Sequence, residues 1–269
     1  MHPVIFQTKF FALNTLWIFI AIGILLGTHF LIKLSVRNGL KLQFISDNGW
    51  KMIFWSIVGA RIFNILINLD TYFYEFSFKT LAQTLFIWDK GLNLWGAVIA
   101  FVIYFYQLCK EKDQDFFKWM DVMVPSAIVL LAVSHIGAFF DGINYGKPTD
   151  LPWGVNFENF QIKYTVPIHP TQIYAFIYSS AIAAALIGAK RLQKIIKLQK
   201  KGFIALSGVA AYNIFRFLED FLRGDDVYLL FGQIRSTMVL SAITVIAASV
   251  ILYLRYNNGR KNSKPKSKK

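Results

Sequence analysis

Long runs of apolar residues recur along the whole chain and alternate with short links that carry most of the charges. A helix needs about 20 mostly apolar residues to cross a bilayer, and each run is close to that length. The pattern therefore predicts an all-α integral membrane protein with about seven transmembrane helices. The expected crossings are residues 12–32, 52–68, 91–108, 121–140, 171–189, 202–218 and 237–254.

The composition agrees with a membrane protein. Hydrophobic residues make up 55% of the chain and charged residues only 16%, whereas a soluble domain carries about 25% charged residues. We expect one seven-helix domain over residues 1–256, with a periplasmic loop at 141–168. A basic tail at 257–269 is expected to be cytoplasmic and disordered.

Lysine and arginine concentrate on one side of the predicted membrane. They fill the link between the first two crossings, the link between the fifth and sixth crossings, and the tail. Because basic links stay in the cytoplasm, the N-terminus is expected outside a bacterial plasma (inner) membrane and the C-terminus inside. These links account for the net charge of +14 and would face anionic membrane lipid. No nucleic-acid-binding signature is present, so nucleic acid is not an expected partner.

The cysteine and histidine content restricts the chemistry further. Cys109 is the single cysteine, so no disulfide forms within the chain. The four histidines are scattered rather than spaced as zinc ligands. We therefore expect no metal and no cofactor.

Four ionisable side chains lie inside or at the ends of predicted crossings, each toward the outer side: Arg61, His135, His169 and Arg216. A charge in hydrocarbon costs about 2.5–3.5 kcal/mol on insertion scales, so such residues usually have a function. Two arginines and two histidines at one depth suit the binding of an anionic headgroup and a proton transfer.

Each of these residues also has a purely structural interpretation. Arg61 would pair with a carboxylate such as Asp220, and His135 would link two helices through a hydrogen bond. Arg216 stands at helical spacing from three charged residues with which it would form ion pairs, namely Glu219, Asp220 and Arg223. The pattern alone leaves both interpretations open.

His169 and Pro170 precede the fifth crossing. Proline suits the first turn of a helix, where its missing N–H removes no bond, and free N–H groups at a helix start attract phosphate. The alternative is an ordinary proline-started helix. Upstream, the polar stretch 142–149 contains Gly142 and Gly146, and glycine there permits a close backbone approach. Residues 155–166 are expected to form a lid or a short hairpin.

Several segments together resemble one known family. His169 to Tyr174 fit the pattern H-P-[ST]-Q-[LI]-Y, residues 145–157 fit Y-G-K-P-T-D-L-P-W-G-V-x-F, and 59–61 fit G-A-R. A further pattern, Y-x-x-x-R-F-x-x-[ED]-x-x-R, is met by Tyr212, Arg216, Phe217, Asp220 and Arg223. Over nearly its whole length the chain is similar to the bacterial prolipoprotein diacylglyceryl transferases.

The resemblance implies transfer of the diacylglyceryl group of phosphatidylglycerol to the lipobox cysteine thiol in the signal peptide of a preprolipoprotein. A histidine titrates in the range of a general base and arginine suits a leaving phosphate, so the candidates for catalysis are His135, His169 and Arg216. The set expected to bind the lipid phosphate and headgroup is Arg61, Trp95, Gly146, Gln172, Tyr212, Asp220 and Arg223.

Four positions depart from the family pattern. Trp95 stands where the family has a histidine, His135 where it has an arginine that faces the lipid phosphate, and Ala138 where it has an asparagine. Leu16 aligns loosely with a tyrosine of the family early in the first crossing. The chain is therefore read as a divergent member. Two alternative functions stay open: a transferase of the same scaffold with another acceptor, and a lipid-binding membrane protein without catalysis.

Overall fold

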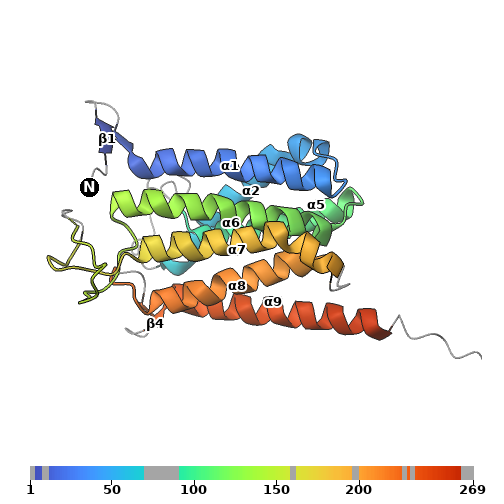
Figure 1. The fold of residues 1–269 in the computed structure, drawn as a ribbon. Coiled ribbons are helices and arrows are strands. Elements are labelled where there is room, and N and C mark those ends of the chain that lie inside the picture. Colours follow the sequence, from blue (N-terminus) through green and yellow to red (C-terminus); the bar gives the residue numbers. More distant parts are fainter. Residues whose placement is uncertain are drawn as a thin grey trace, which may run out of the picture. The chain divides into compact units, whose positions relative to one another are not determined.

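The fold is a set of long helices with a few short strands (Figure 1). The computed structural model describes residues 4–7, 12–69, 91–157, 162–195, 200–225, 229–230 and 234–261. Within them, the helices are α1 (Thr15–Arg37), α2 (Gln43–Ile67), α5 (Leu94–Glu111), α6 (Phe116–Asp141), α7 (Thr171–Ile195), α8 (Phe203–Asp220) and α9 (Ser236–Lys261). Strands β1 (Val4–Gln7) and β2 (Ala12–Asn14) pair antiparallel, as do β3 (Leu229–Leu230) and β4 (Ile234–Arg235).

The helical membrane fold predicted from the sequence is confirmed. Six of the described helices are long and apolar enough to cross a membrane, namely α1, α2, α5, α6, α7 and α9. Helix α8 occupies the remaining predicted crossing, but its last five residues include Arg216, Glu219 and Asp220. The charged side chains at the end of α8 thus need ion pairs or hydrogen bonds with other polar groups.

The helix ends differ from the predicted crossings. Helix α2 begins at Gln43 rather than at residue 52, and α6 begins at Phe116 rather than at 121. Hydropathy locates the hydrocarbon core, whereas a helix continues into the polar interface on either side. The predicted start of the first crossing at residue 12 is wrong, because residues 12–14 form β2. At the other end, α9 continues to Lys261, and residues 262–269 of the predicted tail lie outside the described residues.

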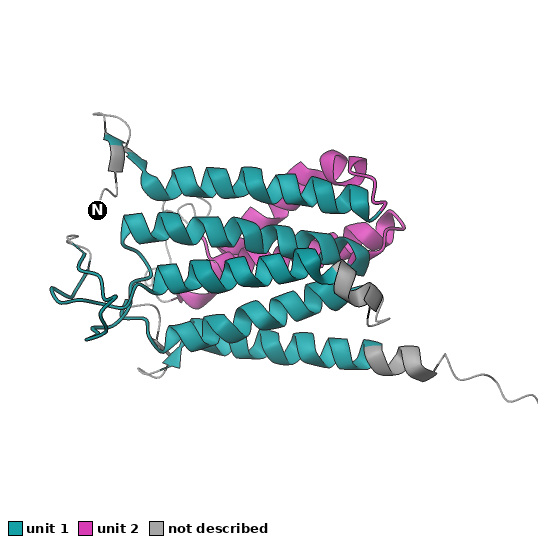
Figure 2. Cartoon of the chain, in the orientation of Figure 1, with its two compact units in different colours: residues 1–38, 117–269 teal, residues 39–116 magenta. Residues whose placement is uncertain are grey.

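The chain divides into two compact units (Figure 2). The first unit comprises Met1–Asn38 and Phe117–Lys269, and the second comprises Gly39–Phe116. The domain arrangement expected from the sequence, with a boundary at residue 256, stays a prediction.

In the first unit, helices α1, α6, α7, α8 and α9 run side by side (Figure 1). Residues of α6, α7 and α8 form its apolar core, around Ile128, Ala175 and Ile204. Helix α1 lies antiparallel to α6. Near the start of α1, the Phe19 ring stacks on Phe140 at the end of α6, with ring centroids 5.7 Å apart. Further along α1, Gly27 faces the backbone of Ser126, which lies nearer the start of α6. The start of α1 therefore lies at the same end as the end of α6.

The opposite end of the first unit holds the starts of α6 and α8 and the end of α9. The Asp121 carboxylate accepts hydrogen bonds from the backbone N–H groups of Gly202 at 2.6 Å and Ala205 at 2.8 Å. The guanidinium of Arg255 lies 3.7 Å from the centre of the Phe117 ring. Lys200 and Lys201, just before α8, and Arg255 in α9 thus belong to the same end.

In the second unit, α2 and α5 cross closely at two glycines. A Cβ atom on Gly96 would lie 2.5 Å from the carbonyl oxygen of Gly59, and a Cβ on Gly59 would overlap the side chain of Ala100. Small residues let two membrane helices approach until their backbones touch. Asn93 caps α5, accepting from the N–H of Trp95 at 2.9 Å, and its own N–H donates to the Ala60 carbonyl at 3.1 Å. The crossing thus fixes the turn of α2 that carries Arg61.

The close crossing predicts that Gly59→Ala lowers stability. The added methyl must displace Ala100, and overpacking of this kind costs about 1–3 kcal/mol. The matched control is Gly49→Ala in the same helix, where an added Cβ meets nothing within 4 Å. Thermal unfolding of the purified protein in detergent measures both variants. Equal melting temperatures for the two variants would contradict the crossing.

Candidate functional site

The polar residues of the first unit gather at the end where α8 finishes. Arg216, Glu219 and Asp220 follow one another at spacings of three and four residues, so they share a face of the last turn of α8. Side chains from α7, α9 and the loops complete this group, called the α8 cluster below: Asn144, Tyr178, Tyr212, Arg216, Glu219, Asp220, Arg223, Asp225, Arg235 and Thr237.

Arg216 is held by two buried carboxylates. Its Nη1 donates to Glu219 Oε1 at 2.5 Å, and its Nη2 lies 3.4 Å from Asp220 Oδ1. The other oxygen of Glu219 accepts a hydrogen bond from the Tyr178 hydroxyl at 2.7 Å. Tyr178 in turn packs against the Tyr212 ring, with centroids 5.8 Å apart. The ion pairs expected from helical spacing are therefore present, and Tyr178 ties α7 to them.

Arg223 joins the loops rather than pointing to open space. Its Nη2 donates to Asn144 Oδ1 at 2.7 Å, its Nε donates to Asp225 Oδ1 at 2.9 Å, and it forms an ion pair with Asp225. Its side chain is only 2% exposed. The contacts of Arg223 with the chain itself thus favour a structural role over the substrate role implied by the family resemblance.

Arg235 reinforces this junction. Its Nη1 donates to Asp225 Oδ1 at 3.0 Å, and its Nη2 donates to the Arg223 carbonyl at 3.0 Å and the Asp225 carbonyl at 2.6 Å. Burial raises the pKa of the Asp225 carboxyl, and the charge and hydrogen bonds of Arg235 offset part of that rise. Thr237, at the start of α9, donates to Asp220 Oδ2 at 2.6 Å. The end of α8 and the start of α9 are therefore locked together.

Gly146 lies where three segments meet. Its N–H donates to the His169 carbonyl at 3.1 Å, and it pairs with Arg223 in an isolated bridge. A Cβ on Gly146 would overlap the backbone of His169, and a Cβ on Gly224 would lie 2.5 Å from the Gly146 carbonyl oxygen. Only glycine fits at residue 146, which explains its place in the family pattern through packing.

The start of α7 is anchored to the same loop. Thr171 Oγ1 donates to the Asn144 carbonyl at 2.5 Å, and Gln172 Nε2 donates to the Ile143 carbonyl at 2.7 Å. The backbone N–H groups of Thr171 and Ile173 donate to the carbonyls of His169 and Pro170. Two of the N–H groups expected to attract phosphate are therefore engaged within the chain. The buried Oε1 of Gln172 has no hydrogen-bond partner among the described residues.

The expected lid or hairpin at 155–166 is only partly described. Val155 and Ile168 exchange backbone hydrogen bonds at 3.0 and 3.1 Å, so the chain does return on itself, but it pairs at Ile168 rather than within 155–166. Residues 158–161 lie outside the described residues.

The two candidate histidines have different surroundings. Nδ1 of His169 lies 3.3 Å from the Tyr174 hydroxyl, which accepts a hydrogen bond from Trp153 Nε1 at 2.7 Å. Burial lowers the pKa of His169 below its ordinary value, so its ring is neutral at pH 7. His135 lies in α6 within the electrostatic reach of Arg216, and its buried Nε2 has no hydrogen-bond partner among the described residues. The charge of Arg216 thus acts on His135.

Arg61 and Trp95 belong to the second unit. Arg61 is buried in α2 and its Nη1 donates to the Gly91 carbonyl at 3.2 Å. Trp95 is half-buried in the first turn of α5. Among the described residues, no three His, Cys, Asp or Glu side chains gather in a way that could hold a metal ion.

Sequence reasoning missed Asn144, Tyr178, Asp225, Arg235 and Thr237. One signal was available for Tyr178, which lies four residues after Tyr174 of the quoted pattern and so extends the same helix face. Partners of the other residues are set by how the loops fold, which residue spacing does not reveal.

A model of the prolipoprotein diacylglyceryl transferase family matches residues 3–254. The chain belongs to this family. Its relatives include a phosphatidylglycerol–prolipoprotein diacylglyceryl transferase of Finegoldia magna, 31% identical over 91% of this chain and 93% of the relative. A protein of the same name from Clostridium tetani is 31% identical over 84% of this chain and 86% of the relative. Another, from a Synechococcus strain, is 28% identical over 98% of this chain and 95% of the relative.

The buried pairing of Arg216 with Glu219 predicts that Glu219→Gln destabilises the protein. The change leaves the Arg216 charge without one of its two carboxylates, and breaking a buried pair costs about 3–5 kcal/mol. Glu111→Gln is the matched control, because the Glu111 side chain is 67% exposed and its ion pair with Lys112 lies at the surface. Chemical or thermal unfolding in detergent measures both. A Glu219→Gln variant as stable as Glu111→Gln would contradict the paired arrangement.

Proposed function

We propose that this chain transfers the diacylglyceryl group of phosphatidylglycerol to the lipobox cysteine thiol of a preprolipoprotein. The observation that carries the proposal is the position of Arg216. This arginine of the family pattern lies near the end of α8, close enough for its charge to act on His135, whose Nε2 is buried without a hydrogen-bond partner among the described residues. In such an arrangement the arginine can bind the phosphate, and the histidine nitrogen, which has no hydrogen-bond partner, can accept the thiol proton.

The reaction makes one bond and breaks another. The cysteine sulfur attacks the carbon of the diacylglyceryl group that is bonded to the phosphate oxygen. The S–C bond forms, and the C–O bond between the diacylglyceryl group and the phosphate breaks. The phosphate oxygen keeps the electron pair and leaves as glycerol 1-phosphate, and the thiol proton passes to a base. A free thiol has a pKa of about 8.5, so a base or a cationic field must promote its ionisation.

Arg216 is the arginine of the α8 cluster that is best placed for the phosphate. The cluster holds three arginines, Arg216, Arg223 and Arg235, and the three carboxylates Glu219, Asp220 and Asp225, so its formal charges balance. The Arg216 side chain is 15% exposed, against 2% for Arg223 and 10% for Arg235. Glu219 and Asp220 fix the guanidinium, and a fixed donor stabilises developing negative charge without reorganising.

We assign the base to His135. Because Trp153 donates to the Tyr174 hydroxyl, that hydroxyl is able to donate its own proton to His169 Nδ1. The proton of a neutral His169 ring then sits on Nε2, and the basic nitrogen is already engaged. Nε2 of His135 has no such partner among the described residues. His169 then orders the start of α7 through its backbone contacts with Gly146 and Lys147.

The proposal places the α8 cluster on the outer side of the plasma membrane. Within the first unit, the start of α1 lies at the cluster end, whereas Lys200, Lys201 and Arg255 lie at the opposite end, beside the starts of α6 and α8. The positive-inside rule assigns the basic end to the cytoplasm. The roles implied for Arg61 and Trp95 remain part of this proposal and concern the headgroup.

A second candidate is a transferase of the same scaffold with a different acceptor, favoured by the departures at Trp95, His135 and Ala138. The two candidates differ in product. Cells depleted of their own transferase and expressing this chain provide the test, with mass spectrometry of a lipobox peptide. A diacylglyceryl mass on cysteine supports the first function, and released glycerol phosphate without that adduct supports the second. Neither product would mean a lipid-binding protein without catalysis.

Arg216→Gln is expected to lower transfer by about 10²–10³-fold, the usual effect of removing one donor that stabilises developing charge. The matched control Lys33→Gln removes one positive charge from an exposed residue of α1 and should transfer as the wild type does. Initial rates of glycerol phosphate release in proteoliposomes measure both. Wild-type rates for Arg216→Gln would remove this arginine from the site.

His135→Gln is expected to lower turnover by about 10²–10⁴-fold, as the loss of a general base does, and His169→Gln by less. Because burial lowers the pKa of His169 from 6.5, its protonation affects the rate only below pH 6.5. Rate–pH profiles of both variants decide between the histidines. If His169→Gln loses turnover and the remaining rate no longer falls at acidic pH, the base is His169 instead.

A further inference from the structure

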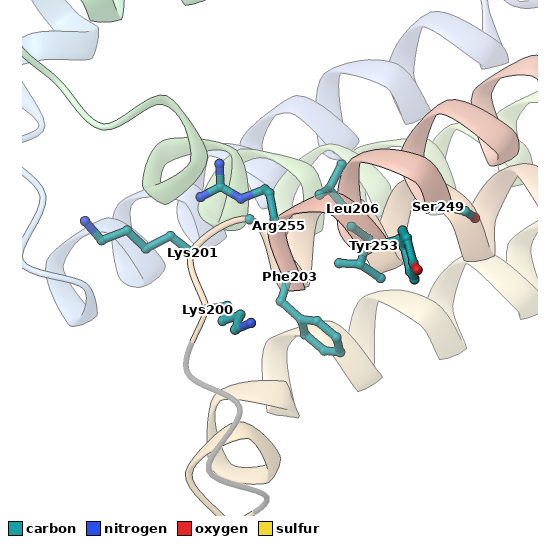
Figure 3. Close-up of a pocket in the computed structure, with 9 residues that line it drawn as sticks. Lys200, Lys201, Phe203, Leu206, Ser249, Tyr253 and Arg255 are labelled. Carbon is teal, nitrogen blue, oxygen red and sulfur yellow. The ribbon is translucent and has the colours of Figure 1, made fainter. Parts of the chain in front are cut away.

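A pocket lies at the end of the first unit that is opposite the α8 cluster. It has a volume of about 270 Å³ and lies between the start of α8 and residues 249–255 of α9 (Figure 3). Three basic side chains line it, Lys200, Lys201 and Arg255, together with Phe203, Leu206 and Tyr253.

Charge and apolar surface are separated along this pocket. In Figure 3 the basic side chains lie toward one end, whereas Leu206, Tyr253 and Ser249 lie toward the other end. The basic end is continuous in sequence with two lysine- and arginine-rich stretches, the link at 190–201 and the chain after 255. A basic end joined to an apolar end matches a molecule with an anionic head and a hydrocarbon tail.

The positive charge of the pocket comes from side chains rather than from a helix start. The first N–H groups of α8, on Gly202 and Ala205, already donate to the Asp121 carboxylate. The Asp121 carboxylate lies at this start of α8 and offsets part of the positive charge of Lys200, Lys201 and Arg255. Arg255 is held in place by the Phe117 ring beneath its guanidinium, 3.7 Å from the ring centre.

We propose that this pocket binds one anionic phospholipid of the cytoplasmic leaflet. Lys200, Lys201 and Arg255 hold its phosphate, and Phe203, Leu206 and Tyr253 cover the first part of an acyl chain. Tyrosine is favoured at this depth, where its ring is apolar and its hydroxyl meets water. The site lies apart from the α8 cluster, so it goes beyond the proposed transfer reaction, and it rests on the orientation proposed above.

Native mass spectrometry of the full chain in a neutral detergent tests the proposal, with dioleoyl phosphatidylserine as the probe and dioleoyl phosphatidylcholine as the uncharged comparison. Each basic residue near an anionic lipid strengthens binding by about fivefold. Lys200→Gln/Lys201→Gln/Arg255→Gln should therefore weaken phosphatidylserine binding at least about tenfold. The charge-matched control, Lys33→Gln/Lys41→Gln/Lys110→Gln, changes three exposed lysines outside the pocket and should bind as the wild type does.

Several outcomes would overturn the proposal. If both triple variants lose phosphatidylserine binding equally, the lipid is attracted by surface charge in general. If the variant at Lys200, Lys201 and Arg255 loses no binding, the pocket is not a lipid site. Competition by inorganic phosphate as strong as that by lipid would mean a site for a soluble anion. Should the pocket variant melt early, Leu206→Trp fills the apolar half with all charges kept, and unchanged lipid binding there would equally refute the site. Transfer activity, measured separately, should persist in the pocket variant.

Discussion

The need to neutralise charge in a medium that solvates it poorly governs the first unit. Three arginines and three carboxylates meet at one end of the helices, and each lies within ion-pair distance of an opposite charge. These pairs come from α8, from the chain that follows it and from the residue just before α9. Tyr178 adds α7 through Glu219, and Thr237 adds α9 through Asp220. A network that satisfies its own charges also determines which helix ends lie together.

Such a network holds a cation in a fixed position and offsets the free energy of removing its charge from water. An arginine alone in hydrocarbon would be expelled or would draw in water, whereas Arg216 is both neutralised and still partly accessible. This combination is what a leaving phosphate requires, because the donor must be in place before the charge develops. The same reasoning separates Arg216 from Arg223, whose Nε and Nη2 donate to Asp225 and Asn144 and whose side chain is only 2% exposed.

The sequence was sufficient to predict the helices, because a crossing depends only on the apolar content of a local stretch. It also offered the pairing of Arg216 with Glu219 and Asp220 as one of two interpretations, since helical spacing is local too. It could not predict that Tyr178 contacts Glu219, a residue 41 positions away on another helix. Nor could it predict the contacts of Arg235 with Asp225, which depend on how the chain turns between α8 and α9. The family resemblance identified Gly146 and Arg223 as notable, but only the contacts show that packing and hydrogen bonds within the chain account for both.

The junction around Gly146 limits how this end of the molecule can move. The loop before α7, the start of α7 and the segment after α8 are joined by backbone hydrogen bonds on both sides of one residue that has no room for a side chain. These three pieces must therefore shift together or not at all. A bulky lipid or peptide cannot gain access by swinging this loop aside, as it could with a hinged flap. Under the proposed transfer reaction, we therefore expect a lipid to reach Arg216 between helices, from the plane of the bilayer, rather than past this loop.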